Sequence, residues 1–209
     1  MLSNGLKCTG NSEKRELDIG AVVVAGGNST RFGSNKLKAI IGKKSILEHV
    51  LSSLLSLGLR EIVLVVSERE KLYYPGINVI LENEHNLSGA ISTGISACSA
   101  RRVFLTAGDM PFLNPQAIYR QSMLAEFSIP VWKNGNLEPF HSVVGKNLCE
   151  FLGESHRVGE AILASGVVPV PAEAFPEYEF FNINTPEDLE KARKILEGKL
   201  LSEPFHNFR

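Results

Sequence analysis

The chain has 209 residues, of which 44% are hydrophobic and 22% are charged, as in ordinary globular proteins. Its 22 Lys and Arg residues against 23 Asp and Glu residues give a net charge of −1, which argues against binding nucleic acid or anionic membranes through concentrated positive charge. The longest aliphatic runs, at residues 21–25 and 62–66, are far shorter than the roughly 20 apolar residues of a membrane-spanning helix. No apolar signal segment is visible, and the three cysteines are odd in number and widely spaced, so we expect a cytoplasmic protein without a disulfide framework.

Short β-branched runs alternate with helical stretches from Ile19 onward. Strands are predicted at residues 19–25, 61–66, 77–81, 102–107, 129–132, 141–144, 167–170 and 179–181. Helix starts are predicted at Ser45, with Glu48 completing a capping box, at Asn114-Pro115 and at Thr185-Pro186. This alternation favours a mostly parallel α/β sheet. We expect residues 1–18 to be a flexible N-terminal extension, residues 19–199 to form a single domain and residues 200–209 to be a C-terminal tail. Residues 169–176 are expected to be a surface loop.

A glycine-rich turn follows the first predicted strand. It runs from Gly26 and Gly27 to Lys36 and carries Arg31 five residues before that lysine. Glycines let a backbone approach a ligand closely, and exposed N–H groups with Arg and Lys favour a polyphosphate. The spacing is neither that of a Walker A loop nor that of the G-x-G-x-x-G fingerprint. The two glycines alone would fit an ordinary turn, but with both cations the segment predicts a phosphate site.

An acidic turn, Gly108-Asp109, follows the strand predicted at residues 102–107. Ligands of open α/β sheets bind beyond the carboxyl ends of strands, and a carboxylate there can hold Mg²⁺ against phosphate oxygens. Because both turns follow central-looking strands, we expect them to face one cleft. The structural alternative is that Asp109 only caps a turn.

Two later segments carry candidate polar ligands. Asn182 and Asn184 alternate around Ile183 at a predicted strand end, and amides can ligate a hard metal or pair with a heterocycle. Alternatively, Asn184 only helps to cap the following helix. Glu138 and His141 lie in a turn that leads into a strand, where a histidine by itself is more often a structural residue.

Together, the four segments resemble the signatures of the MobA-like nucleotidyltransferases, and most closely those of the molybdenum cofactor guanylyltransferases. Residues 24–36 are similar to L-A-G-G-x-S-x-R-M-G-x-D-K, and residues 109–112 read D-M-P-F. Residues 138–144 are similar to E-P-L-H-A-V-Y, and residues 182–189 contain N-I-N-T-P-E-D-L intact. The resemblance covers residues 20–196.

The resemblance implies an α/β, three-layer Rossmann-like (GT-A-like) nucleotidyltransferase fold with a mostly parallel central sheet. It implies transfer of GMP from Mg-GTP to molybdopterin, with Arg31 and Lys36 on the phosphates and Asp109 holding Mg²⁺. The acceptor is already a phosphate monoester anion, so positioning and electrostatic stabilisation account for most of the catalysis.

The remaining implied contacts divide between nucleotide and acceptor. Backbone contacts to the nucleotide fall on Val24, Ala25, Gly26 and Gly27. Asn83 aligns with a position where the family often has an acid that reads the N–H groups of guanine. The residues expected to border the pterin or the metal are Glu138, His141, Asn182 and Asn184.

Two other readings are kept open. One is a nucleotidyltransferase with another phosphorylated acceptor or nucleotide, such as a CTP:molybdopterin, cobinamide phosphate or sugar phosphate enzyme. The other is a non-catalytic nucleotide-binding protein. The expected partners are GTP and molybdopterin, with transient contacts to other cofactor-biosynthesis proteins and without nucleic acid or membrane.

Overall fold

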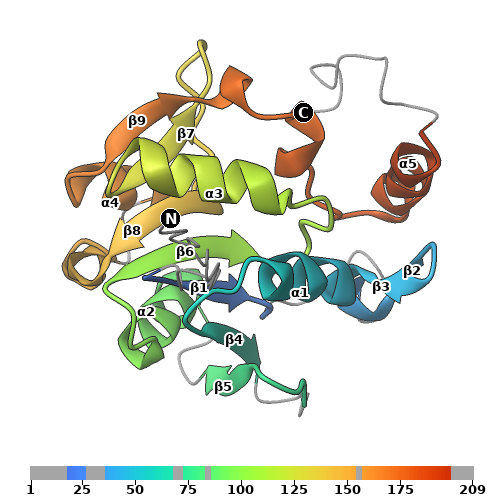
Figure 1. Cartoon of the computed structure of the whole chain (residues 1–209), viewed down its shortest axis with the longest axis horizontal. Coiled ribbons are helices and arrows are strands. Elements are labelled where there is room, and N and C mark those ends of the chain that lie inside the picture. The colour runs from blue at the N-terminus through green and yellow to red at the C-terminus, as the bar shows by residue number, and fades with distance from the viewer. Residues whose placement is uncertain (1–17, 27–35, 68–72, 83–85, 154–156, 199–209) are drawn as a thin grey trace, which may run out of the picture.

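A seven-stranded sheet forms the centre of the computed structural model, which describes residues 18–26, 36–67, 73–82, 86–153 and 157–198 (Figure 1). The strand order is β5-β4-β1-β6-β8-β7-β9. In chain order, the strands are β1 (Ile19–Val24), β4 (Ile62–Ser67), β5 (Asn78–Glu82), β6 (Arg102–Ala107), β7 (Ser128–Val131), β8 (His141–Gly145) and β9 (Val168–Pro171). Strand β8 runs antiparallel to both neighbours, and the remaining pairs are parallel. The predicted mostly parallel α/β fold is confirmed.

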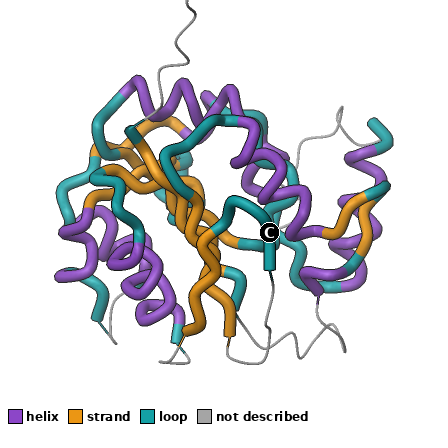
Figure 2. Tube along the Cα trace, turned by 60° about the horizontal axis from the view of Figure 1, so that its bottom comes forward, coloured by secondary structure: helices purple, strands orange, loops and turns teal. Residues whose placement is uncertain are grey.

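Helices cover both faces of the sheet, which gives three layers (Figure 2). The α-helices are α1 (Ile46–Ser56), α2 (Leu87–Ala97), α3 (Pro115–Leu124), α4 (Val158–Ala164) and α5 (Pro186–Leu196). Alternate side chains of β1 enter opposite cores: Val23 packs with α1 and α3, whereas Val22 packs with α2 and α4. Because the sheet is covered on both faces, β1 is apolar along its whole length and β4 is apolar up to its last residue, Ser67.

Shorter elements connect these layers. A two-stranded hairpin of β2 (Ile40–Ile41) and β3 (Lys44–Ser45) precedes α1. The 3-10 helices are η1 (Lys36–Lys38), η2 (Lys146–Glu150), η3 (Ala172–Ala174) and η4 (Glu177–Phe180). No helix within the described ranges is long and apolar enough to cross a membrane.

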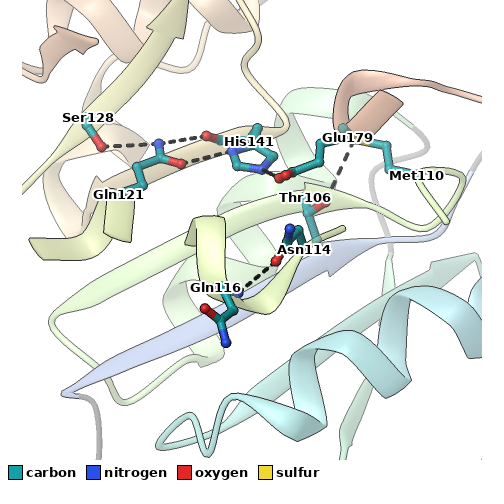
Figure 3. Close-up of polar contacts among 8 residues, drawn as sticks. All are labelled: Thr106, Met110, Asn114, Gln116, Gln121, Ser128, His141 and Glu179. Carbon is teal, nitrogen blue, oxygen red and sulfur yellow. Dashed lines mark hydrogen bonds and ion pairs between the residues drawn. The ribbon is translucent and has the colours of Figure 1, made fainter. Parts of the chain in front are cut away.

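The predicted helix starts are confirmed by their capping hydrogen bonds. The Ser45 side chain accepts from the Glu48 N–H, and the Glu48 carboxylate accepts from the Ser45 N–H. Asn114 caps α3 through the N–H of Gln116, as Figure 3 shows. Thr185 caps α5, with Asp188 closing the box.

The strand predicted at residues 179–181 is wrong. These residues fall in and beside η4, which follows Pro176. The hydrogen bond from the Glu179 N–H to the Pro176 carbonyl closes the first turn of this 3-10 helix. The surface-loop prediction for residues 169–176 also needs correction. That stretch contains most of β9, all of η3 and the buried Phe175 ring.

Strand β9 forms one end of the sheet and has the sequence Val168-Pro169-Val170-Pro171. It pairs in parallel with β7, and its Val168 N–H donates to the Phe127 carbonyl on that side. Two prolines therefore alternate with two valines along the last strand of the sheet.

Candidate functional site

Three polar side chains from distant parts of the sequence meet beyond the ends of the central strands. The Lys36 Nζ donates to Asp109 Oδ2 at 2.6 Å and to Asn184 Oδ1 at 3.0 Å. We call Lys36, Asp109 and Asn184 the lysine cluster. The Lys36 and Asp109 side chains keep 20% and 16% of their surface exposed, so solvent and ligands can reach them.

Asp109 is held by the turn that ends β6. The Gly108 N–H donates to the Val24 carbonyl, and a Cβ on Gly108 would lie 3.1 Å from the Ala25 Cβ. A glycine therefore lets this turn pack directly on β1. On the far side, the Ile183 N–H donates to the Asp109 carbonyl at 3.0 Å, which ties the segment before α5 to the same turn.

The lysine cluster contains groups that suit a divalent cation. Asp109 Oδ1 is buried and has no hydrogen-bond partner among the described residues, so one carboxylate oxygen is unsatisfied. No group of three or more His, Cys, Asp or Glu side chains that could hold a metal occurs in the described part of the chain. A single carboxylate supplemented by an amide fits a cation that takes its other ligands from water and phosphate, as Mg²⁺ usually does.

Asn184 is available to the lysine cluster because a neighbour caps the helix. Thr185 is the N-cap of α5, and the Asp188 carboxylate accepts from the backbone N–H groups of Asn184 and Thr185. The Asn184 side chain points instead to Lys36. Asn182 differs, because its amide donates to the Phe180 carbonyl at 3.3 Å and not to the lysine cluster. The shared face predicted for the two asparagines depended on a strand that is absent there.

The end of β1 packs tightly before the glycine-rich turn. The Val24 carbonyl accepts from Gly108, and the Ala25 N–H donates to the Val65 carbonyl at 2.8 Å. These two backbone groups already have protein partners, and the nucleotide contacts predicted for Val24, Ala25 and Gly26 stay predictions. Gly27, Arg31 and Asn83 lie outside the described residues, and their predicted roles stay predictions.

Glu82 is a candidate that sequence reasoning missed. Its side chain is buried at the end of β5, and its Oε1 has no hydrogen-bond partner among the described residues. A Cβ on Gly26 would lie 2.8 Å from Glu82 Oε2, so the carboxylate lies directly against the glycine turn. The sequence signal that could have found Glu82 is its position: it is a carboxylate at the end of a hydrophobic strand, next to Asn83.

His141 and Glu138 do not occupy the places predicted for them. His141 has no exposed surface: its Nδ1 lies 2.9 Å from Gln121 Oε1 and its Nε2 lies 3.2 Å from Glu179 Oε2 (Figure 3). Glu138 is buried and accepts from Trp132 Nε1 at 2.5 Å. Both side chains lie in the interior: Phe175 and Phe180 pack against the His141 ring, and the Trp132 indole bonds to Glu138. We call Gln121, His141 and Glu179 the histidine cluster.

A pocket of about 1220 Å³ opens beside the N-terminal turn of α2. Its walls come from that turn, from the β7–β8 connection and from the start of α4. Residues that represent these walls are Asn86, Ser92, Leu137, Phe140, Arg157 and Glu160. None of the three lysine-cluster residues lines it, although the start of α2 and the Asp109 turn both follow carboxyl ends of parallel strands. The pocket offers room for a large ligand with apolar, amide and charged contacts.

A mostly parallel α/β sheet with a lysine, a carboxylate and an amide beyond its strand ends has the architecture of a nucleotide-handling enzyme. Residues 21–166 match the model of the MobA-like NTP transferase domain. The chain belongs to this family of nucleotidyltransferases.

Relatives of known name agree with this assignment. The chain is 34% identical over 197 residues to a Pyrococcus furiosus protein named "Probable molybdenum cofactor guanylyltransferase", covering 85% of this chain and 97% of that one. A similar protein of the same name from Thermococcus gammatolerans is 35% identical over 194 residues, covering 84% of this chain and 99% of that one.

Solved structures share the fold. The molybdopterin-guanine dinucleotide biosynthesis protein A of Archaeoglobus fulgidus superposes with a TM-score of 0.67 at 21% identity, over 86% of this chain and 99% of that chain. A nucleotidyl transferase from Methanothermobacter gives a TM-score of 0.73 at 22% identity, over 86% and 98% of the two chains. At these identities the likeness concerns the fold alone.

Proposed function

We propose that the protein transfers the GMP moiety of GTP to the phosphate of molybdopterin and releases pyrophosphate. The observation that carries this proposal is the lysine cluster, in which a cation, a carboxylate with an unsatisfied oxygen and an amide meet. The family membership and the names of the relatives supply the substrates. A cytoplasmic location and transient contacts with other cofactor-biosynthesis proteins stay predictions.

The reaction needs charge stabilisation more than proton transfer. An oxygen of the acceptor phosphate attacks the α-phosphorus of GTP, a new P–O bond forms, and the bond from the α-phosphorus to the bridging oxygen breaks. The pyrophosphate leaves with the bonding electron pair. Because the attacking oxygen is already anionic, the enzyme needs no general base and acts by alignment and electrostatic stabilisation.

Each member of the lysine cluster has a part in this scheme. Lys36 exchanges its bonds to Asp109 and Asn184 for phosphate oxygens when the nucleotide binds. Asp109 and Asn184 would hold Mg²⁺, which would supply positive charge against the triphosphate. In the absence of nucleotide, the lysine ammonium neutralises Asp109, as the 2.6 Å contact indicates.

Glu82 is our candidate for recognition of guanine. A carboxylate has two acceptor oxygens and can receive the N1–H and N2–H₂ groups of guanine together, which adenine and cytosine do not present in the same pattern. Its unsatisfied Oε1 and its position against Gly26 support this role. In this proposal Glu82 has the role that the family resemblance implied for the neighbouring Asn83.

The test is a pyrophosphate-release assay with GTP, CTP and ATP, each with Mg²⁺ and with or without molybdopterin. We expect release only with GTP and the acceptor together. A thermal shift complements it, since a ligand at 100 times its dissociation constant adds about 2.7 kcal/mol of stability. Release with CTP but not GTP would reject the guanylyl assignment, and nucleotide binding without any transfer would favour a non-catalytic protein.

A further inference from the structure

The hydrogen bonds of the histidine cluster fix where its protons are. The Gln121 Nε2 donates to the His141 carbonyl at 2.8 Å and to Ser128 Oγ at 3.2 Å (Figure 3). A carbonyl oxygen only accepts, so the Gln121 amide cannot be flipped, and its Oε1 must face His141 Nδ1. His141 Nδ1 therefore carries a proton.

The contact between His141 and Glu179 must contain one further proton. His141 Nε2 lies 3.2 Å from Glu179 Oε2, and both side chains are fully buried. Without a proton between them, a lone pair on nitrogen would face a carboxylate lone pair. With one proton, the contact is a hydrogen bond and the pair is neutral overall, whether the proton lies on nitrogen or on oxygen. Three aromatic rings, those of Phe104, Phe175 and Phe180, surround the imidazole at centroid distances of 5.1–5.2 Å and exclude water.

This shared proton joins the sheet to the segment that carries Asn184. His141 pairs with Thr106 in β6, three residues before Asp109. Glu179 lies in η4, five residues before Asn184, and the Ile183 N–H between them donates to the Asp109 carbonyl. The histidine cluster is therefore connected by short stretches of chain to two of the three members of the lysine cluster.

We propose that Glu179 and His141 are positioning residues, whose shared proton fixes the segment from Glu179 to Asn184 and so sets the place of Asn184 and Asp109 around Lys36. This inference rests on the proposed function of the lysine cluster. It adds that a hydrogen bond of the right length, and not the negative charge of Glu179, is what the site requires. Displacements near 1 Å at a reacting centre can cost about 100-fold in rate, so loss of this bond should reduce turnover.

Two substitutions of similar size separate the hydrogen bond from simple packing. Glu179→Gln keeps a donor that can reach a neutral His141 Nε2, whereas Glu179→Met fills the same space without a donor or an acceptor. We expect kcat per folded enzyme to stay within about threefold of wild type for Glu179→Gln and to fall about 10–100-fold for Glu179→Met. Glu187→Met, at an exposed position on the first turn of α5, is the matched control and should leave kcat unchanged.

A second measurement follows the segment itself. Amide hydrogen exchange at Ile183 should accelerate in Glu179→Met and stay slow in Glu179→Gln, because the first variant releases the chain that holds this N–H on Asp109. If Glu179→Met fails to fold, Glu179→Asp replaces it: the shorter side chain keeps the carboxyl group but does not reach His141 Nε2, and kcat should again fall.

Specific outcomes would overturn the inference. Wild-type kcat and Ile183 protection in Glu179→Met, or wild-type kcat in Glu179→Asp, would make the pair ordinary core packing. Equal losses in Glu179→Gln and Glu179→Met would make the charge essential. Nitrogen NMR of wild-type His141 should find Nδ1 protonated, and a bare Nδ1 would also reject the scheme. If the wild-type protein transfers no guanylyl group at all, the proposed function fails, while the exchange and NMR experiments still test the positioning pair.

Discussion

The lysine cluster and the histidine cluster are built from the same three kinds of group: a basic side chain, a carboxylate and a carboxamide. Lys36 and Asp109 keep 20% and 16% of their side-chain surface exposed, and Asp109 Oδ1 is unsatisfied. His141 and Glu179 are fully buried among aromatic rings. The same chemistry thus serves two purposes. In the partly exposed lysine cluster, the side chains can replace their hydrogen bonds to one another by bonds to a ligand. In the buried histidine cluster, they can only hold the chain in place.

The largest expected effect is on stability, in the histidine cluster. His141→Leu leaves the buried Glu179 carboxyl without its partner and should lower the free energy of unfolding by about 3–5 kcal/mol. Urea denaturation measures this loss. Lys36→Leu is the counterpart in the lysine cluster and should cost less than about 1 kcal/mol, since its ion pair is partly exposed. Similar losses in both variants would erase the contrast between the clusters.

The second effect is on turnover, in the lysine cluster. Lys36→Ala and Asp109→Asn should each lower guanylyl transfer by about 10²–10³-fold, because in the proposed scheme each removes a charge that would stabilise the triphosphate or its metal. Lys38→Ala, an exposed lysine on the same 3-10 helix, is the control. A Mg²⁺ titration of Asp109→Asn that reaches wild-type kinetics at ordinary concentrations would reduce Asp109 to a turn residue.

Substituting the two asparagines should have smaller effects, and the two variants should affect different substrates. In the proposed scheme the Asn184 amide oxygen leaves Lys36 and would bind Mg²⁺, and a contact of this kind to a charged group contributes about 1.5 kcal/mol or more. Asn184→Ala should therefore weaken the affinity for Mg-GTP about tenfold. The Asn182 amide bonds to the Phe180 carbonyl and not to Lys36, so Asn182→Ala should leave GTP affinity within a few fold. If Asn182 borders the acceptor, as the family resemblance implies, the same variant should raise the KM for molybdopterin. Titration calorimetry and steady-state kinetics separate the two; equal effects on GTP would place both in one role.

The smallest expected effect is on the free energy of unfolding and its pH dependence, and it comes from Glu61, a carboxylate outside both clusters. Burial raises the pKa of Glu61, but hydrogen bonds from Ser99 and Ala100 outweigh it and hold this pKa below its ordinary value of 4.5. A lowered folded-state pKa means that the stabilisation is complete above about pH 5 and is lost as pH falls through the folded value. Glu61→Gln should cost at most about 1 kcal/mol at pH 7 and should flatten the acid side of the stability profile. Urea denaturation at pH 7 and pH 4 measures both; an unchanged acid slope would contradict the assignment.

Local signals in the sequence were sufficient for much of this structure. Ser45 and Thr185 predict helix starts because their capping partners lie within three residues along the chain. The meeting of Lys36 with Asp109 followed from the rule that ligands gather at the carboxyl ends of parallel strands.

Local sequence patterns could not predict which polar side chains are buried or which partners they meet. Gln121 and Glu179 lie 20 and 38 residues from His141, and nothing in their immediate sequence indicates that they meet it. Glu82 ends a strand, where a carboxylate usually faces solvent, and only its packing against Gly26 reveals it as buried. In each case the decisive contact is between elements that are brought together by the sheet order.

The prolines of β9 have a consequence for solubility. Residues two apart in a strand direct their N–H groups to the same side, so Val168 and Val170 face β7, and positions 169 and 171 face away from it. Proline has no N–H at either outward position. An incoming strand would meet carbonyl oxygens there without the donors it needs to complete a ladder. This end of the sheet is thereby guarded against edge-to-edge aggregation, and replacing both prolines by valine would remove that guard.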